Sequence, residues 1–228
     1  MFASEDIPEF INTAADSISL STADSPQRAA WRHLASRLDS LEHHTSSSVV
    51  RILHIGDSHI QAEFVTNALR AMLQDTYGNA GRGLVSPLRL AGTNQPVDYT
   101  ITATAASDWR KTRLLKLPWN ATPGVTGIAA QPVRATTATI KALGLGHKIK
   151  QATILTASGD KAYSYTSPQD SISINLNADE SLYGAILENG QPGVLYSAIG
   201  NNGACFTDYL LIPGFVKGTE VFHPDLIV

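Results

Sequence analysis

Residues 49 to 58 read VVRILHIGDS, an apolar run that ends at a glycine, an aspartate and a serine. Continuous apolarity without alternation is typical of a strand in a parallel sheet that is covered on both faces. Apolar residues then recur at helical spacing from Ala62 to Leu73, and the glycine-rich segment 78–83 ends this pattern near Tyr77. A strand, a tight turn and a helix therefore place residues 56 to 59 at the carboxyl end of a strand, where open α/β sheets bind their ligands.

The segment before this strand, residues 1–48, is predicted to contain one helix and a linker. Ser25 is a candidate N-cap and Pro26 suits the first helical position. Five apolar residues follow at helical spacing, and we expect this stripe to pack in a core: Ala30, Trp31, Leu34, Leu38 and Leu41.

After about Val97 the sequence changes from helical to alternating patterns. Residues 97–104 and 171–176 alternate apolar and polar, and the segments 133–140 and 151–157 are rich in threonine. Helical periodicity is essentially absent from 97 to 190. These features predict an antiparallel β-sandwich domain over residues 97–193.

A continuous apolar run returns at residues 194–199, followed by Gly200-Asn201-Asn202-Gly203 and a short helix expected near Ala204. Residues 223–228 resemble the start of another buried strand. We therefore expect an α/β core built from residues 49–96 and 194–228, with the β-sandwich inserted between them. Because a compact domain seldom stops in a core strand, we also expect the natural protein to be longer.

Composition excludes several classes of protein. The 228 residues include 17 Lys+Arg and 20 Asp+Glu, a formal net charge of -3, so there is no basic surplus for a nucleic-acid partner. No run approaches the roughly 20 apolar residues of a membrane span. A single cysteine, Cys205, cannot form an intramolecular disulfide, and no Cys/His spacing indicates a zinc site. An export signal is not visible either, because Glu5, Asp6 and Glu9 stand where its basic and apolar regions belong.

Ser58 is the strongest candidate for chemistry. A serine between a buried strand and a helix is exposed on a tight turn, and the helix supplies backbone N–H groups and a positive dipole end. An acyl-transfer nucleophile uses these features, because its tetrahedral intermediate carries an oxyanion. The local pattern supports equally well a structural role, with Ser58 as a helix cap and Asp57 as a turn residue.

The order of three short segments resembles a known family. GDSH at residues 56–59, followed by Gln61, Ala62 and Phe64, resembles the first block of the SGNH hydrolases, or GDSL esterases and acylhydrolases. YGNAGRG at 77–83, a β-rich insertion and GNNGA at 200–204 are similar to the bacterial peptidoglycan O-acetylesterases. The SGNH core of those enzymes is interrupted by a β domain like a carbohydrate-binding module.

This resemblance implies a flavodoxin-like α/β fold and a division of roles. It implies that Ser58 is the nucleophile, that Asp57 supports the first block, and that the Gly203 N–H contributes to the oxyanion hole, with Gly200 as the less favoured alternative. The implied substrate is an acylated cell-envelope polysaccharide, located outside the cytoplasm. No metal or organic cofactor is implied.

The chain departs from the family pattern in its last blocks. It contains neither a Gly-x-Asn segment after residues 224–228 nor an Asp-x-x-His segment, which would carry the general base. Three histidines are possible substitutes and each is disfavoured: His59 adjoins Ser58, His54 lies in a buried strand, and His223 is expected at the opposite end of the sheet. We therefore expect the base to lie outside this chain and the chain alone to be nearly inactive.

A second interpretation belongs to another class of protein. A noncatalytic carbohydrate-binding or scaffold protein could retain a degenerate esterase core. Four aromatic residues of the inserted region would then be candidates for stacking on sugars: Trp109, Trp119, Tyr163 and Tyr165. Aromatic residues of a sandwich more often pack in its core. In either case an open sheet edge beside residues 226–228 would favour self-association or association with a missing segment.

Overall fold

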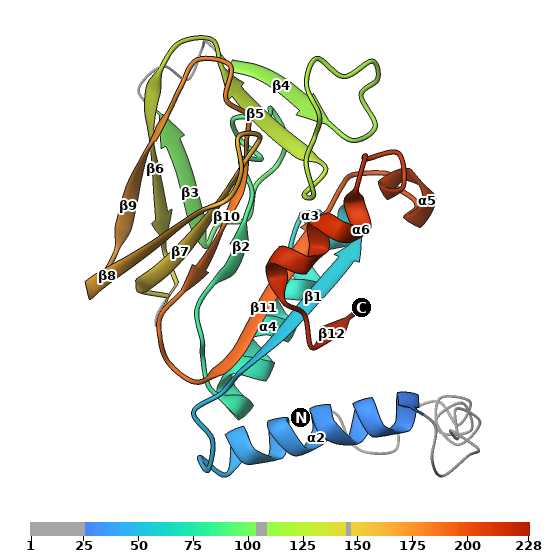
Figure 1. The fold of residues 1–228 in the computed structure, drawn as a ribbon, viewed down its shortest axis with the longest axis vertical. Helices are drawn as coiled ribbons and strands as arrows, with labels where there is room; N and C mark the ends of the chain where they lie inside the picture. The colour runs from blue at the N-terminus through green and yellow to red at the C-terminus, as the bar shows by residue number, and fades with distance from the viewer. Residues whose placement is uncertain (1–25, 104–108, 145–146) are drawn as a thin grey trace. The chain divides into compact units, whose positions relative to one another are not determined.

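A computed structural model describes residues 26–103, 109–144 and 147–228 (Figure 1). Two units are distinguished: one ends at Ser36, and the structure describes its residues 26–36, and the other is formed by residues 37–228. The predicted N-cap Ser25 and the acidic residues near the N-terminus lie outside the described residues. Within those residues, no helix is long and apolar enough to cross a membrane.

The first described element is helix α2, Pro26–Glu42, which begins at the proline as predicted. Leu34 and Leu41 are buried, but Ala30 and Trp31 are exposed, so the expectation of core packing is wrong for these two residues. An apolar stripe identifies the face of a helix that can be buried, but it does not ensure that a partner surface covers the whole face.

A three-stranded parallel sheet follows, with the order β11-β1-β12. It is formed by β1 (Val49–Gly56), β11 (Gly193–Gly200) and the short edge strand β12 (Leu226–Ile227). The register pairs Val49 with Gly193 and Gly56 with Gly200, so β1 and β11 end side by side. The predicted strands 49–55 and 194–199 are confirmed, and both loops of interest leave the same end of the sheet.

Short and long helices connect these strands. After β1 come α3 (Ser58–Gln61) and α4 (Phe64–Tyr77), and after β11 come α5 (Phe206–Tyr209), α6 (Phe215–Gly218) and the 3-10 helix η1 (Thr219–Phe222). The helix expected up to Tyr77 is therefore confirmed, with a separate first turn at Ser58. The short helix expected near Ala204 begins at Phe206.

The segment 223–228 does not form the buried strand that was expected. Ile227 and Val228 are 54% and 56% exposed, and the strand has only two residues. It pairs with β1 on one side and with no strand of the described residues on the other. Self-association at this edge stays a prediction.

The middle of the chain is rich in antiparallel strands, as predicted, and no helix lies between 97 and 190 among the described residues. One sheet has the order β3-β6-β9: Tyr99–Ala103, Thr136–Ala142 and Ser171–Leu176. The other has the order β4-β5-β10-β7-β8: Trp109–Arg113, Ile128–Pro132, Leu182–Glu188, Ile149–Thr156 and Lys161–Gln169. Buried residues of both sheets, such as Ile140 and Ile154, form one hydrophobic cluster.

Strand β2 (Gly83–Val85) joins the α/β part to this β-rich part. It belongs to the expected core segment 49–96, yet it pairs antiparallel with β10, aligning Val85 with Ala185. A second hydrophobic cluster combines Leu53 of β1 with Leu84 and Ile186. The division into a core of 49–96 and 194–228 and an insertion of 97–193 therefore stays a prediction, because the second compact unit spans both parts.

Helix α4 buries a polar face. Thr66, Arg70 and Gln74 are buried, whereas Phe64 and Met72 are 85% and 68% exposed. The cause is a network of four charges. The Arg70 and Arg82 guanidiniums both pair with the carboxylates of Glu63 and Asp98, at N···O distances of 2.6 to 3.1 Å.

Candidate active site

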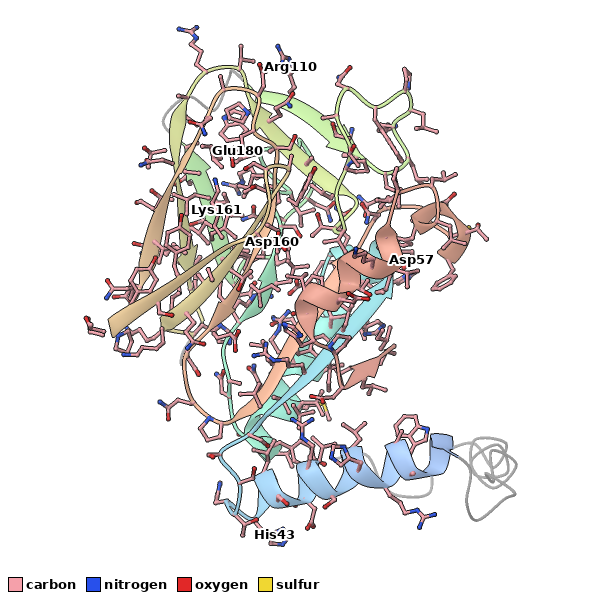
Figure 2. The ribbon with its side chains drawn as sticks, viewed as in Figure 1. His43, Asp57, Arg110, Asp160, Lys161 and Glu180 are labelled. Carbon is pink, nitrogen blue, oxygen red and sulfur yellow. The ribbon has the colours of Figure 1, made fainter. Side chains whose placement is uncertain are left out.

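Ser58 is the first residue of α3 and is half-buried. The cap of this helix is Asp57, whose side chain accepts a hydrogen bond from the His59 backbone N–H at 2.9 Å. The alternative in which Ser58 caps the helix is therefore wrong, and its hydroxyl is not used for that purpose. Figure 2 shows Asp57 beside the end of β1, well apart from the labelled Glu180 and Lys161 of the β-rich region.

Asp57 also orients its neighbour. The ring Nδ1 of His59 lies 3.1 Å from the same carboxylate oxygen, and the His59 side chain is 79% exposed. Hydrogen bonds from the His59 backbone and then from its ring lower the pKa of Asp57. Among the described residues, none forms a side-chain hydrogen bond with the Ser58 hydroxyl, so His59 does not act on it in this structure.

The loop after β11 packs directly on the Ser58 turn. The Asn201 N–H donates to the Gly56 carbonyl at 3.2 Å, and the Asn202 N–H donates to Gln61 Oε1 at 2.9 Å. The Tyr209 hydroxyl donates to the same Gly56 carbonyl. Segments that are more than 140 residues apart in the sequence are thus joined at one end of the sheet, as the two expected blocks require.

Gly203 and Gly200 differ in what surrounds them. Gly203 has φ +79° and is exposed, and a Cβ added there would meet only the Leu115 side chain at 3.6 Å. A Cβ added at Gly200 would lie 2.0 Å from the Gln61 backbone nitrogen. Gly200 is therefore needed for close packing, whereas the backbone at Gly203 is accessible to a ligand.

Gln61 organises the site, a role that the sequence did not reveal. Its side chain is buried, and its Nε2 donates to Thr93 Oγ1 at 2.9 Å and to Asn94 Oδ1 at 2.8 Å. Asn202 Nδ2 donates to the same Asn94 oxygen at 3.0 Å. This polar network fixes α3, the loop after β11 and residues 93–94 relative to one another.

A cavity of about 260 Å³ adjoins this network. Its lining comes from five parts of the chain: Gln61, Thr93, Arg113, Leu114, Leu115, Lys116, Ile128, Asn201 and Asn202. Buried Asn201 donates through Nδ2 to the Thr126 carbonyl and to the Tyr209 hydroxyl. Its Oδ1 has no hydrogen-bond partner among the described residues. A polar, half-open cavity therefore lies beside the loop that carries Gly203.

The two other candidate bases lie elsewhere. His54 is half-buried in β1 and hydrogen-bonds the Tyr196 hydroxyl, and desolvation lowers its pKa. His223 precedes Asp225, whose backbone N–H binds the Arg51 carbonyl. It therefore lies at the opposite end of β1, about 17 Å along five strand residues from Gly56, as expected.

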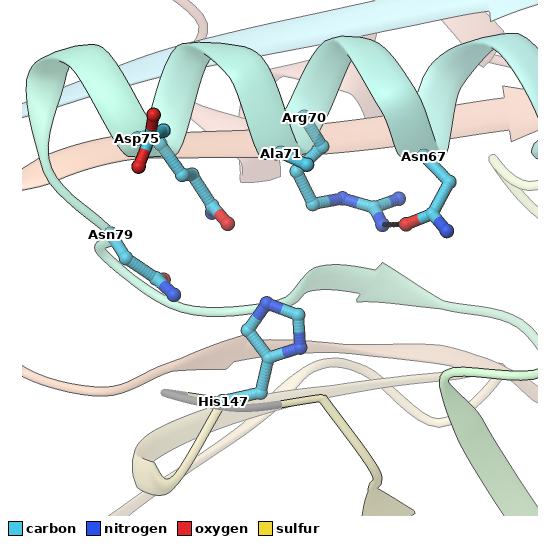
Figure 3. A pocket seen from close by; sticks show the side chains of 7 residues that line it. Asn67, Arg70, Ala71, Asp75, Asn79 and His147 are labelled. Carbon is cyan, nitrogen blue, oxygen red and sulfur yellow. Dashed lines mark hydrogen bonds between the residues drawn. The ribbon is translucent and has the colours of Figure 1, made fainter.

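A second cavity, of about 310 Å³, is lined by residues of α4 together with Asn79 and His147 (Figure 3). Asn79 pairs with Val194 near the start of β11, whereas the Ser58 turn packs against the end of that strand. Six strand residues, about 20 Å, separate these two levels. None of the site residues expected from the sequence lines this cavity.

Of the four aromatic residues considered as sugar platforms, one is buried, two are half-buried and one is exposed. Trp109 is 7% exposed within the first hydrophobic cluster, and Trp119 donates its Nε1–H to the Leu114 carbonyl. Tyr165 packs against the same cluster, and Tyr163 on β8 is 36% exposed. The interpretation of Trp109 as a stacking platform is therefore wrong. Among the described residues, no group of three or more His, Cys, Asp or Glu side chains is placed to hold a metal ion.

Comparisons with known proteins give a likeness among solved structures. No family model and no curated protein matches the sequence. Among solved structures, a peptidoglycan O-acetylesterase superposes with a TM-score of 0.60 over 85% of this chain, at 21% sequence identity. The match covers 59% of that esterase's chain. At this identity the likeness concerns the fold alone, which in this chain combines a parallel sheet and its helices with antiparallel sheets.

Proposed function

We propose that this chain carries part of the active site of a serine esterase that removes acyl groups, above all O-acetyl groups, from a bacterial cell-envelope polysaccharide such as peptidoglycan. The observation that carries the proposal is the junction between the Ser58 turn and the Gly200–Ala204 loop, held by the bonds of Asn201 and Asn202 to Gly56 and Gln61. A fold shared with a peptidoglycan O-acetylesterase supports it. Such a substrate would be met outside the cytoplasm.

In this proposal Ser58 Oγ attacks the ester carbonyl while its proton passes to a general base. The Gly203 N–H donates to the oxyanion, where a preorganised donor has its largest effect. Collapse of the intermediate releases the sugar hydroxyl and leaves an acyl-serine, which water hydrolyses to acetate. Asp57 contributes by capping α3, which fixes the turn that presents Ser58.

We propose further that the base and its orienting carboxylate lie outside residues 1–228. No described histidine hydrogen-bonds Ser58, and no histidine of the chain has an aspartate three positions before it. Without a base, a serine hydroxyl is a weak nucleophile at neutral pH. The 228-residue chain should then hydrolyse activated acetyl esters only marginally.

The esterase activity and the external base are both tested by measuring acetate release from an activated ester and from O-acetylated peptidoglycan. The 228-residue chain is compared with the full gene product. The full product should be active, and Ser58→Ala should lower its turnover by about 10⁴-fold. Ser164→Ala, at an exposed serine of β8, is the matched control and should leave turnover unchanged. Strong Ser58-dependent activity of the 228 residues alone would refute the external base. A folded but inactive full product would favour the noncatalytic carbohydrate-binding alternative.

A further inference from the structure

A cationic segment borders the cavity beside Gly203. Residues 110–116 read RKTRLLK, and they run from β4 into the following loop. Arg110 pairs with Asp179 on the far side of β4, but Arg113 and Lys116 line the cavity of about 260 Å³. Neither of them has a carboxylate partner within the described part of the chain. Arg113 makes only a long, 3.5 Å hydrogen bond to the Gly92 carbonyl.

Arg113 is unusual for this protein, because it is half-buried without a carboxylate partner, whereas half-buried or buried cations such as Arg51, Arg70 and Arg82 are paired with nearby carboxylates. Lys116 is exposed and adds a second charge at the cavity, in a protein whose formal net charge is -3. Two unpaired cations on one cavity wall create a local positive potential, which a wall of low dielectric constant strengthens. The cavity therefore favours an anionic group.

Other residues that line the cavity belong to the candidate site itself. Thr93 and Asn202 offer polar side chains, and Asn202 lies in the loop that carries Gly203. Leu115 also lines the cavity, and its side chain lies 3.6 Å from the place of a Cβ added at Gly203. Cations, polar side chains and an apolar contact thus lie beside the proposed oxyanion donor.

We propose that this cavity is a subsite for a sugar unit that carries a carboxylate, with Arg113 and Lys116 binding the carboxylate and the polar side chains of Thr93 and Asn202 beside the sugar hydroxyls. Arg113 can bind a carboxylate through two parallel N–H bonds, and Lys116 adds a point charge. The volume is slightly below the roughly 300–1,000 Å³ of small-molecule pockets, which suits one sugar unit rather than a longer segment. This inference rests on the proposed function for its role in catalysis and extends it by naming the chemistry of the substrate.

Binding is measured on the 228-residue chain carrying Ser58→Ala, so that the result does not depend on catalysis. Two sugar pairs serve as probes in titrations followed by NMR chemical shifts. N-acetylmuramic acid differs from N-acetylglucosamine by a lactyl carboxylate, and glucuronic acid differs from glucose by a carboxylate at C6. We expect the acidic member of at least one pair to bind about 10-fold more tightly, with an affinity that falls as salt is added.

The variant Arg113→Gln/Lys116→Gln should remove this preference and leave the weak binding of the neutral sugars within about 2-fold. Lys217→Gln, which removes an exposed cation on α6, is the charge control and should preserve the preference. Preference within the muramic pair alone assigns the subsite to the lactyl group, and preference within both pairs assigns it to carboxylated sugars in general. Equal binding of acidic and neutral sugars, or a preference that survives the double variant, would overturn the proposal. An inactive esterase with an intact acid preference would overturn only the proposed function.

Discussion

Gly200 allows the loop after β11 to lie directly on α3. A Cβ at this position would lie 2.0 Å from the Gln61 nitrogen and 2.5 Å from its Cα, and these backbone atoms cannot move aside as a flexible side chain can. Gly200→Ala should therefore lower the free energy of unfolding by about 3 kcal/mol, at the upper end of the usual cost of overpacking. Urea denaturation measures this change.

Gly214→Ala is the matched control for the previous substitution. Gly214 has φ +71° and nothing within 4 Å of an added Cβ, so only backbone strain of about 1–2 kcal/mol is expected. A Gly200→Ala variant no less stable than Gly214→Ala would contradict the steric explanation. Because Gly200 and Gln61 hold the two site loops together, the first variant should also broaden the NMR signals of residues 56–61.

Residues of the candidate site could be predicted where the signal is local. The turn GDS follows its strand directly, and GNNG follows the other strand, so both loops were found from the sequence. Gln61 joins them through a partner 141 residues away, and no local pattern reports such a pair. The cations Arg113 and Lys116 are visible as a basic run, but only the fold places them beside Gly203.

Among the elements, α4 depends on buried charges rather than on its apolar stripe. Glu63 binds both Arg70 and Arg82, with all three side chains 7% exposed or less. Glu63→Gln would leave two guanidiniums sharing the carboxylate of Asp98, so the free energy of unfolding should fall by about 3–5 kcal/mol. Chemical denaturation followed by circular dichroism measures the loss.

Arg110→Gln provides the comparison for a surface pair. Arg110 and Asp179 are about half exposed, and such pairs contribute roughly 0–1 kcal/mol. If both substitutions cost the same, the network does not stabilise α4 in the way described. Both substitutions remove a charge from an ion pair, but only Glu63 is buried. A larger loss for Glu63→Gln is therefore due to the burial of its ion pairs.

Strands and helices were predicted well where the pattern reports backbone periodicity, as for β1, β9 and β11. Burial was predicted less well. Trp31, Phe64 and Ile227 are exposed although their segments are apolar, while Arg70 and Arg82 are among the most buried side chains. A hydrophobic pattern shows which face of an element is suited to burial. What covers that face comes from distant parts of the chain, as Asp98 does for Arg70 of α4.

Across the whole molecule, the parallel sheet and the β-rich region contribute different parts of the proposed site. The sheet supplies two loops that leave the same end, and the β-rich region supplies the cationic wall of the cavity. At the other end of the sheet, His147 faces the same charge network that anchors α4 (Figure 3). The two parts are thus in contact at both ends of β11, and acid should weaken one of these contacts.

His147 is the group whose protonation should weaken this contact. Burial, followed by repulsion from Arg82 and Arg70, lowers its pKa from 6.5 to about 4, against the weaker attraction of Asp98 and Glu63. Its Nδ1 has no hydrogen-bond partner among the described residues, which agrees with a neutral ring. Between pH 6.5 and about 4 the unfolded chain binds more protons at this residue than the folded chain does. The free energy of unfolding should therefore fall as the pH is lowered through this window.

His147→Gln should make the free energy of unfolding, measured by urea denaturation, less dependent on pH between 6.5 and about 4. The control is His43→Gln, at an exposed histidine near the end of α2 whose pKa is raised by the Asp39 carbonyl (Figure 2). A raised pKa gives stability that is present at low pH, so removing His43 can only steepen the fall and cannot flatten it. Carboxylates such as Glu180 also lose stability in acid, because hydrogen bonds from Lys161 and Ser158 outweigh its burial and lower its pKa to about 2. Since that loss falls mainly below pH 4.5, a wild-type slope in the His147 variant between pH 6.5 and 4.5 would refute the role of His147.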